Sequence, residues 1–203
     1  MKKTIFSAFM AILSVFTGLN AQENDSDYSK WQARFRILVI TPSPGDDIEG
    51  ADVDISTSYV PELDFTYFFN KNIAAELILG TSKHEVDVED TDLGSVWLLP
   101  PTLNLQYHFY AGDLKPYIGA GVNYTIFYGV KSGDVVAMDY ENSFGFSFQG
   151  GLDYSLSDKW FLNIDLKKIL LSTDVNVDTG EGLLPVDVDI NPLVIGLGVG
   201  MKF

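Results

Sequence analysis

The 203-residue chain contains no cysteine and carries 13 basic against 28 acidic residues. This negative charge disfavours nucleic acids and anionic surfaces as partners, and the lack of cysteine excludes disulfides and thiolate metal sites. With 46% hydrophobic residues the chain is too apolar to be disordered, and its length suits one domain or one small barrel.

The first 21 residues have the parts of a secretory signal peptide. Lys2 and Lys3 form a positive start, residues 5–16 are mostly apolar, and the segment closes on the small residue Ala21. We predict cleavage after Ala21, which leaves residues 22–203 as a single barrel domain. The alternative, a membrane anchor, is disfavoured because the apolar run is shorter than the ~20 residues that a spanning helix needs.

Eight segments alternate apolar and polar or small residues with a period of two, which is typical of strands whose two faces meet different surroundings. In chain order they are residues 31–41, 59–69, 73–85, 102–110, 116–128, 143–155, 160–172 and 193–203. In the last segment every odd position from Leu193 to Phe203 is apolar, whereas the even positions include three glycines and Lys202. We expect Ile195 and Leu197 on one face and Gly198 on the other.

The connections between these strands alternate between short turns and long, acidic loops. The long loops are predicted at residues 42–58, 85–95, 129–142 and 173–190, and they hold 18 of the 28 acidic residues. One interpretation is a well-solvated outer face. The other is that the carboxylates bind divalent cations at the lipopolysaccharide surface, although no loop has the spacing of an EF-hand.

Aromatic residues lie beside the short turns, where the interfacial girdle of a membrane barrel belongs. They are Phe69, Phe109, Tyr154, Trp160 and Phe203. Together with the signal peptide and the even strand count, they predict an all-β, eight-stranded antiparallel transmembrane barrel in the outer membrane of a Gram-negative cell. Short turns then face the periplasm, long loops face outside, and outer-membrane lipids and lipopolysaccharide are the expected partners.

Charged residues fall at inward positions of the predicted strands. They are Arg34, Arg36, Glu62, Asp64, Glu76, Asp153, Asp165, Lys167 and Lys202. Buried charges must pair because desolvation is otherwise too costly, and eight strands enclose only enough space for side chains or one small ligand. A salt-bridge network that plugs the barrel is favoured over a proton path or an ion filter.

Apolar residues gather at the outer end of the predicted lumen and suggest a gate or lining for a small hydrophobic ligand. They are Trp97, Leu98, Leu99, Leu38, Ile78 and Phe127. Pro100 and Pro101 cannot donate to a strand ladder, so we expect an irregular segment in the wall there, open to a sideways exit. Alternatively these residues simply close the barrel, with Trp97 anchored among lipid head groups.

Catalytic residues, metal ligands and cofactor motifs are not predicted. The histidines are His84 and His108, and only His84 has a serine, Ser82, on the same face of its strand. A satisfied polar histidine is the favoured interpretation of this pair. A purely structural or adhesive barrel with no transport stays open as an alternative.

Several blocks of sequence resemble the OmpW family of small outer-membrane barrels. They are LPPTL at 99–103, KPYIGAGVNY at 115–124, NIAAEL at 72–77, GLDY at 151–154 ahead of Trp160, and the ending Gly-x-Gly-x-x-Phe. The resemblance covers essentially the whole mature chain. It implies an eight-stranded barrel with a narrow, largely apolar lumen that passes small hydrophobic molecules, with sideways release through the wall as the proposed exit. Phe203 resembles the terminal aromatic signal read by the barrel assembly machinery.

Overall fold

A computed structural model describes residues 29–43, 53–88, 91–178, 180 and 182–203. The predicted signal peptide, residues 1–21, lies outside this part of the chain. None of the described residues belongs to a helix that is both long and apolar enough to cross a membrane.

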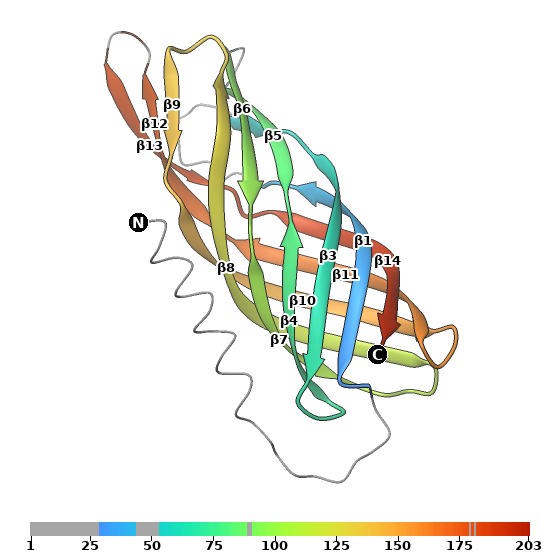
Figure 1. Ribbon diagram of the computed structural model, residues 1–203. Helices are drawn as coiled ribbons and strands as arrows, with labels where there is room; N and C mark the ends of the chain where they lie inside the picture. The colour runs from blue at the N-terminus through green and yellow to red at the C-terminus, as the bar shows by residue number, and fades with distance from the viewer. Residues whose placement is uncertain (1–28, 44–52, 89–90, 179, 181) are drawn as a thin grey trace.

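Eight antiparallel strands close into a barrel, as Figure 1 shows. Their order around the wall is β10-β11-β14-β1-β3-β4-β7-β8, and the pairing of β8 with β10 completes the circle. These strands are β1 (Trp31–Thr41), β3 (Ser58–Phe68), β4 (Ile73–Gly80), β7 (Thr102–His108), β8 (Leu114–Ser132), β10 (Ser143–Ser155), β11 (Trp160–Leu170) and β14 (Leu193–Lys202). The predicted eight-stranded barrel is confirmed.

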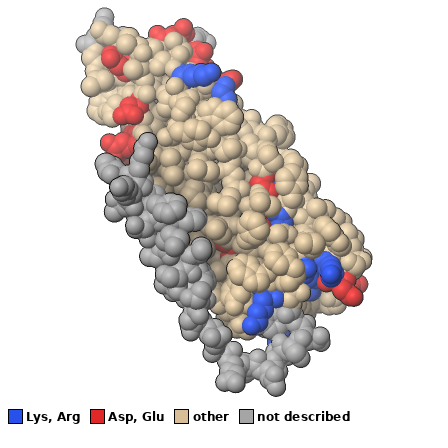
Figure 2. All heavy atoms as spheres, in the orientation of Figure 1, with Lys and Arg blue, Asp and Glu red and all other residues tan. Residues whose placement is uncertain are grey.

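Apolar side chains point outward from the barrel strands and polar ones point inward. Leu197 is 59% exposed and pairs with Ile164 of β11, which also points outward. The next residue of β11, Asp165, points inward and is buried. Outward positions of this kind form a continuous apolar band that suits lipid; they include Phe35, Ile37, Leu63, Leu105, Ile118, Val122, Phe146, Ile164 and Leu197. On the face drawn in Figure 2, charged side chains gather at the two ends and are sparse between them.

The predicted aromatic girdle lies at the end of the barrel that carries the short turns. Phe109, Tyr154, Trp160 and Phe203 are each between 46% and 57% exposed there. Rings inside the barrel are accommodated by glycine, because a Cβ on Gly151 would lie 2.3 Å from the Tyr117 ring. Long charged side chains use the same device, because a Cβ on Gly198 would lie 2.8 Å from Arg36 Cγ.

The long outer connections are present, but most of their described residues form strands that continue beyond the barrel, where irregular loops were predicted. The extra strands are β2 (Val53–Ile55), β5 (Ser82–Val88), β6 (Thr91–Leu99), β9 (Ala137–Tyr140), β12 (Ser172–Asp178) and β13 (Leu183–Asp189). One outer sheet has the order β8-β6-β5-β2 and the other β13-β12-β9. Both rise above the barrel in Figure 1.

The physical reason for these extra strands is an alternation of valine and acidic residues. In β12, Val175 and Val177 are buried while Asp174 is exposed, and in β13 the half-buried Val186 and Val188 alternate with the exposed Asp187. The acidic side chains face water and the valines face the space between the two outer sheets. Each strand is therefore amphipathic with a period of two, like the barrel strands below.

Candidate functional site: an apolar cavity above a charged layer

Arg34 and Arg36 form the centre of a layer of buried charges inside the barrel. The Nε atom of Arg34 lies 2.9 Å from Asp64 Oδ1, and its Nη2 atom lies 2.6 Å from Glu76 Oε1. Arg36 donates from Nε to Glu62 Oε1 at 2.6 Å and reaches Asp64 Oδ2 at 3.0 Å. All these side chains are at most 3% exposed, so water screens their attraction very little.

Further charged groups extend this layer across the barrel to β10 and β11. Asp153 lies 3.7 Å from Arg34, Asp165 lies 3.7 Å from Arg36, and Lys167 lies 3.6 Å from Asp165. The charged layer is thus made of eight of the nine predicted residues: Arg34, Arg36, Glu62, Asp64, Glu76, Asp153, Asp165 and Lys167. Lys202 lies apart near the periplasmic end, 3.4 Å from the Ser155 hydroxyl.

Neutral side chains complete the layer by hydrogen bonds. Gln149 donates to Glu76 Oε2 at 2.8 Å, Asn163 donates to Asp153 at 2.7 Å, and the Tyr117 hydroxyl donates to Asp165 at 2.7 Å. Paired charges of this kind, filled in by amides and a phenol, leave an apolar molecule no favourable way through.

Leu38 and Ile78 are the next inward-facing residues outward from the charged layer on their strands. Each is 5% exposed, and each follows a layer residue, Arg36 or Glu76, by two positions. They therefore cover the charged layer with apolar side chains. Neither residue borders the cavity that lies further out.

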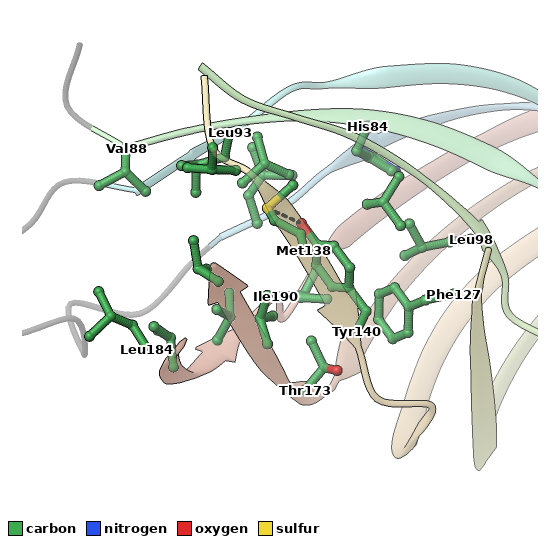
Figure 3. Close-up of a pocket in the computed structure, with 18 of the residues that line it drawn as sticks. His84, Val88, Leu93, Leu98, Phe127, Met138, Tyr140, Thr173, Leu184 and Ile190 are labelled. Atoms are coloured by element: carbon green, nitrogen blue, oxygen red, sulfur yellow. Dashed lines mark hydrogen bonds between the residues drawn. The ribbon is translucent and has the colours of Figure 1, made fainter. Parts of the chain in front are cut away.

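A cavity of about 300 Å³ lies between the two outer sheets, above the barrel. His84, Leu98 and Phe127 lie at its barrel side and Val88 and Leu184 at the far side (Figure 3). The rest of the lining is almost wholly apolar and includes Val86, Val96, Val135, Met138, Val175, Val177, Val186, Val188 and Ile190. An apolar cavity of about 150 Å³ already holds benzene, so this one suits a molecule about twice that size.

Of the six predicted gate residues, some line the cavity and others lie on the outer surface, because successive side chains of a strand point to opposite faces. Leu98 and Phe127 line the cavity. Trp97 and Leu99, by contrast, flank Leu98 on the opposite face of β6 and are 36% and 37% exposed. The prediction that Trp97 and Leu99 line the entry is therefore wrong, because side chains alternate across a strand. Trp97 instead packs beside Tyr128 on the outer surface, with their ring centroids 6.2 Å apart.

Polar groups are few in this cavity and are mostly engaged. His84 Nδ1 donates to the Ser56 carbonyl at 2.8 Å, which leaves Nε2 to accept from the Ser82 hydroxyl at 3.1 Å. Burial lowers the pKa of His84, so the ring is neutral at pH 7. Burial also raises the pKa of Tyr140 to about 12. Among the described residues, no group of three or more histidine, aspartate or glutamate side chains is placed to hold a metal ion.

The wall of the barrel is interrupted just below the cavity. Pairing between β4 and β7 ends at Ile78 and Thr102, and pairing between β5 and β6 starts at Ser82 and Leu98. Residues 79–81 therefore face 99–101 with no backbone hydrogen bond between them. The predicted break at the two prolines is present, and Leu98 borders both the break and the cavity.

A model of the OmpW family matches residues 39–203. The chain belongs to the OmpW family. It is 44% identical over 184 residues to the outer-membrane protein y4mB of Sinorhizobium fredii, covering 86% of this chain and 80% of the relative. It is 28% identical over 165 residues to the dibenzothiophene metabolism operon protein PahQ of Pseudomonas aeruginosa, covering 78% of each. The crystal structure of OprG from Pseudomonas aeruginosa superposes with a TM-score of 0.80 at 27% identity, covering 87% and 97% of the two chains.

This OmpW-family protein is therefore an outer-membrane barrel, whose apolar band contacts lipid. Phe203 lies at the end of the barrel with the short turns, where its backbone exchanges hydrogen bonds with Trp31 of β1.

A second cavity of about 810 Å³ opens at this periplasmic end and is lined largely by polar residues such as Gln32, Lys115 and Lys202. None of the eight residues of the charged layer borders either cavity, so the layer lies between the two.

Most residues of the outer cavity were missed by sequence reasoning. Met138, Tyr140, Val175 and Val188 all come from segments predicted as loops. The signal that locates them is the Val-x-Val alternation within stretches rich in aspartate, as in 173–178 and 185–190. The apolar faces of these strands must be shielded from water. They point toward each other, and the cavity lies between them.

Proposed function

We propose that this protein is a narrow channel that takes small hydrophobic molecules from the cell exterior into the outer membrane. The observation that carries the proposal is the apolar cavity of about 300 Å³ enclosed by the outer strands. A hydrophobic molecule leaving water for this cavity gains about 25 cal/mol for each Å² of apolar surface that it buries. The acidic outer faces of the same strands keep the assembly soluble around it.

The charged layer decides which way such a molecule can leave. Passage straight down would require an apolar molecule to separate Arg34 and Arg36 from the carboxylates that hold them. The break between residues 79–81 and 99–101 offers the other route, because no ladder hydrogen bonds have to be broken there. Sideways release through this break delivers the molecule to lipid, which is its preferred solvent.

The relatives support this interpretation. The similar structure of OprG is that of an outer-membrane protein, and one relative, PahQ, is named after the metabolism of dibenzothiophene, an apolar tricyclic compound. A cavity whose described lining contains no lysine or arginine suits neutral apolar cargo of that general kind.

Other partners follow from the location of the protein. We expect the exposed acidic edges of the outer strands to meet lipopolysaccharide, and Phe203 to be read by the barrel assembly machinery. The His84–Ser82 pair is assigned a structural role, because Ser82 does not border the cavity and the ring fastens β5 to Ser56. On this proposal the protein is not an enzyme.

Uptake by intact cells tests the channel, because lipopolysaccharide slows the entry of apolar molecules. Cells that produce the protein should take up N-phenyl-1-naphthylamine faster than cells with an empty vector. Leu98→Asp places a charge inside the cavity and should reduce uptake to the vector level. Leu183→Asp is the matched control, because this leucine of β13 is exposed, does not border the cavity and is not part of the break, so it should keep most of the uptake.

A second arm separates a channel for apolar cargo from a general pore and from a purely structural barrel. Liposomes that contain the purified protein should not admit a hydrophilic sugar, since the charged layer closes the lumen. Dye uptake with sugar exclusion supports the proposal. Vector-level dye uptake by a correctly assembled wild-type barrel contradicts it and favours the structural barrel.

A further inference from the structure

Of the described residues in the middle of the cavity, Tyr140 alone has a strong hydrogen-bond donor, its hydroxyl, without a strong acceptor. Its partner among the described residues is the sulfur of Met138, at 3.8 Å, and thioether sulfur is only a weak acceptor. The other polar groups at the lining are better satisfied: His84 is bonded through both nitrogens, and Thr173 donates to the Glu141 carbonyl at 2.6 Å. Thr91 is exposed at the outer edge.

The position of this hydroxyl is fixed by packing. The Tyr140 ring stacks on Phe127, with ring centroids 5.4 Å apart and planes 16° apart. Tyr140 comes from β9 and Phe127 from β8, so the stack ties the two outer sheets together at the cavity. In Figure 3 the two rings lie side by side and the hydroxyl points toward Met138 between the sheets. A donor held this way loses little entropy when it binds a ligand.

Tyr140 is partly buried, so its hydroxyl has lost part of its hydrogen bonding to water, and the sulfur of Met138 does not supply the equivalent. Because burial raises the pKa of Tyr140 to about 12, the phenol stays protonated and acts as a donor at physiological pH. A ligand that brings an acceptor oxygen to this point recovers the missing bond, whereas a pure hydrocarbon does not.

The charge of the surroundings restricts the acceptor further. No lysine or arginine borders the cavity in the part of the chain that the structure describes. The outer faces of the strands that surround it carry carboxylates instead, including the exposed Asp54, Asp139, Asp174 and Asp187. An anionic carboxylate on the ligand would be both desolvated and repelled, so the acceptor must be neutral.

We propose that the cavity recognises neutral, mainly hydrophobic molecules that carry one acceptor oxygen, such as ketones, aldehydes, esters or ethers, through a hydrogen bond from the Tyr140 hydroxyl. This selectivity rests on the proposed channel function and names the class of cargo that it prefers. Hydrocarbons of the same size bind through the apolar lining alone, and their carboxylate analogues are excluded.

Binding to the purified barrel in detergent micelles tests this proposal directly. Three competitors of nearly equal shape are titrated against bound N-phenyl-1-naphthylamine: 2-acetylnaphthalene, 2-isopropenylnaphthalene and 2-naphthoate. Tyr140→Phe should weaken 2-acetylnaphthalene about fivefold, the effect of one hydrogen bond, and leave 2-isopropenylnaphthalene nearly unchanged. Neither protein should bind 2-naphthoate measurably.

Two further variants guard the interpretation. Tyr154→Phe makes the same chemical change on an exposed residue at the opposite end of the barrel and should change no affinity. Met138→Leu removes the competing sulfur with little change in volume, so binding of the ketone should stay as strong or become stronger. If Tyr140→Phe misfolds, a Met138→Leu protein that binds the ketone more weakly than wild type overturns the proposal.

The outcomes separate the two proposals. If the wild type binds the hydrocarbon and Tyr140→Phe weakens both neutral competitors equally, or neither, the Tyr140 assignment is wrong and the channel proposal stands. If the wild type binds neither neutral competitor, the cavity is not a binding site and both proposals fail. Tight binding of 2-naphthoate would also overturn the assignment of a neutral acceptor.

Discussion

The charged layer and the outer cavity occupy the same barrel axis and are built by opposite rules. In β11 and its continuation β12, the inward residues are Asn163, Asp165 and Lys167, and then Ile169, Leu171, Thr173, Val175 and Val177, of which Thr173 alone is polar. One column of side chains thus changes from polar to apolar within a few residues. The layer closes the lumen by pairing charges, and the cavity opens a space by leaving hydrophobic faces unfilled.

The outer surface shows the opposite order of polarity: it is apolar around the charged layer and polar around the cavity. In the barrel the outward residues are mainly apolar because they meet lipid, whereas in the outer strands they include charged residues such as Asp174, Asp187 and Lys131, which meet water. Alternation with a period of two continues through both regions. What changes is the surroundings of the inner face and of the outer face. The level at which inside and outside exchange polarity is also the level of the break at Pro100 and Pro101.

The largest expected effect comes from breaking the charged layer. Arg34→Leu leaves Asp64 and Glu76 buried without their nearest cation, and an uncompensated buried charge costs about 3–5 kcal/mol. Urea unfolding of the barrel in vesicles, followed by tryptophan fluorescence, measures the loss. Lys131→Leu removes the same charge from an exposed site on β8 and should have little effect. Equal unfolding free energies for the two variants would show that the layer does not hold the barrel together.

A charge on the outer surface should distinguish lipid from water. Leu197→Arg puts a guanidinium into the apolar band, and arginine near the bilayer midplane costs about 2–4 kcal/mol. Asp174→Arg also places arginine on an outward position, but on β12 beyond the band, where surface changes usually stay within about 0.5 kcal/mol. The same unfolding measurement compares them. Similar losses in both variants would mean that lipid reaches the outer strands.

Sequence reasoning predicted the barrel strands and their facing because lipid on one side forces a strict alternation. It predicted loops where the outer strands lie because clusters such as Asp187 and Asp189 were read as solvated turns, although Val186 and Val188 alternate with them. Trp97 and Leu99 were placed on the wrong side for the same reason: their segment was not read as a strand. In a strand, both residues point away from the side that Leu98 faces.

The pairings within the charged layer could not be derived from sequence. The bond from Arg36 to Glu62 depends on the register of β1 with β3, and the contact with Asp165 depends on β14 lying between β1 and β11. The volume of the cavity depends on the distance between the two outer sheets. The alternation of residues along a strand does not reveal that distance.

A polar substitution in the cavity should loosen the outer strands without disturbing the barrel. Val175→Thr buries a hydroxyl of nearly the same size at a cavity position that is 5% exposed, at a cost of about 1–3 kcal/mol. Amide hydrogen exchange should speed up in β12 and stay unchanged in β11. Asn176→Thr introduces the same residue on the opposite face and should change neither. Faster exchange in β11 for Val175→Thr would show that cavity and barrel open as one unit.

The smallest expected change in stability concerns the break in the wall, where the two regions meet. Replacing Pro100 and Pro101 together by alanine supplies two N–H groups that point to opposite sides of the segment, because the Pro101 carbonyl already accepts from Tyr124 of β8. One of them, at residue 100, faces residues 79–81, and a new hydrogen bond there is worth about 0.5–1.5 kcal/mol. If the break is the exit, the sealed barrel should bind N-phenyl-1-naphthylamine in micelles as the wild type does but take it up into cells more slowly. Pro61→Ala removes a proline from the intact wall between β1 and β3 and should leave both measurements unchanged. Normal uptake by a double variant with a demonstrably closed wall would place the exit elsewhere, and the charged layer would then have to be the element that moves.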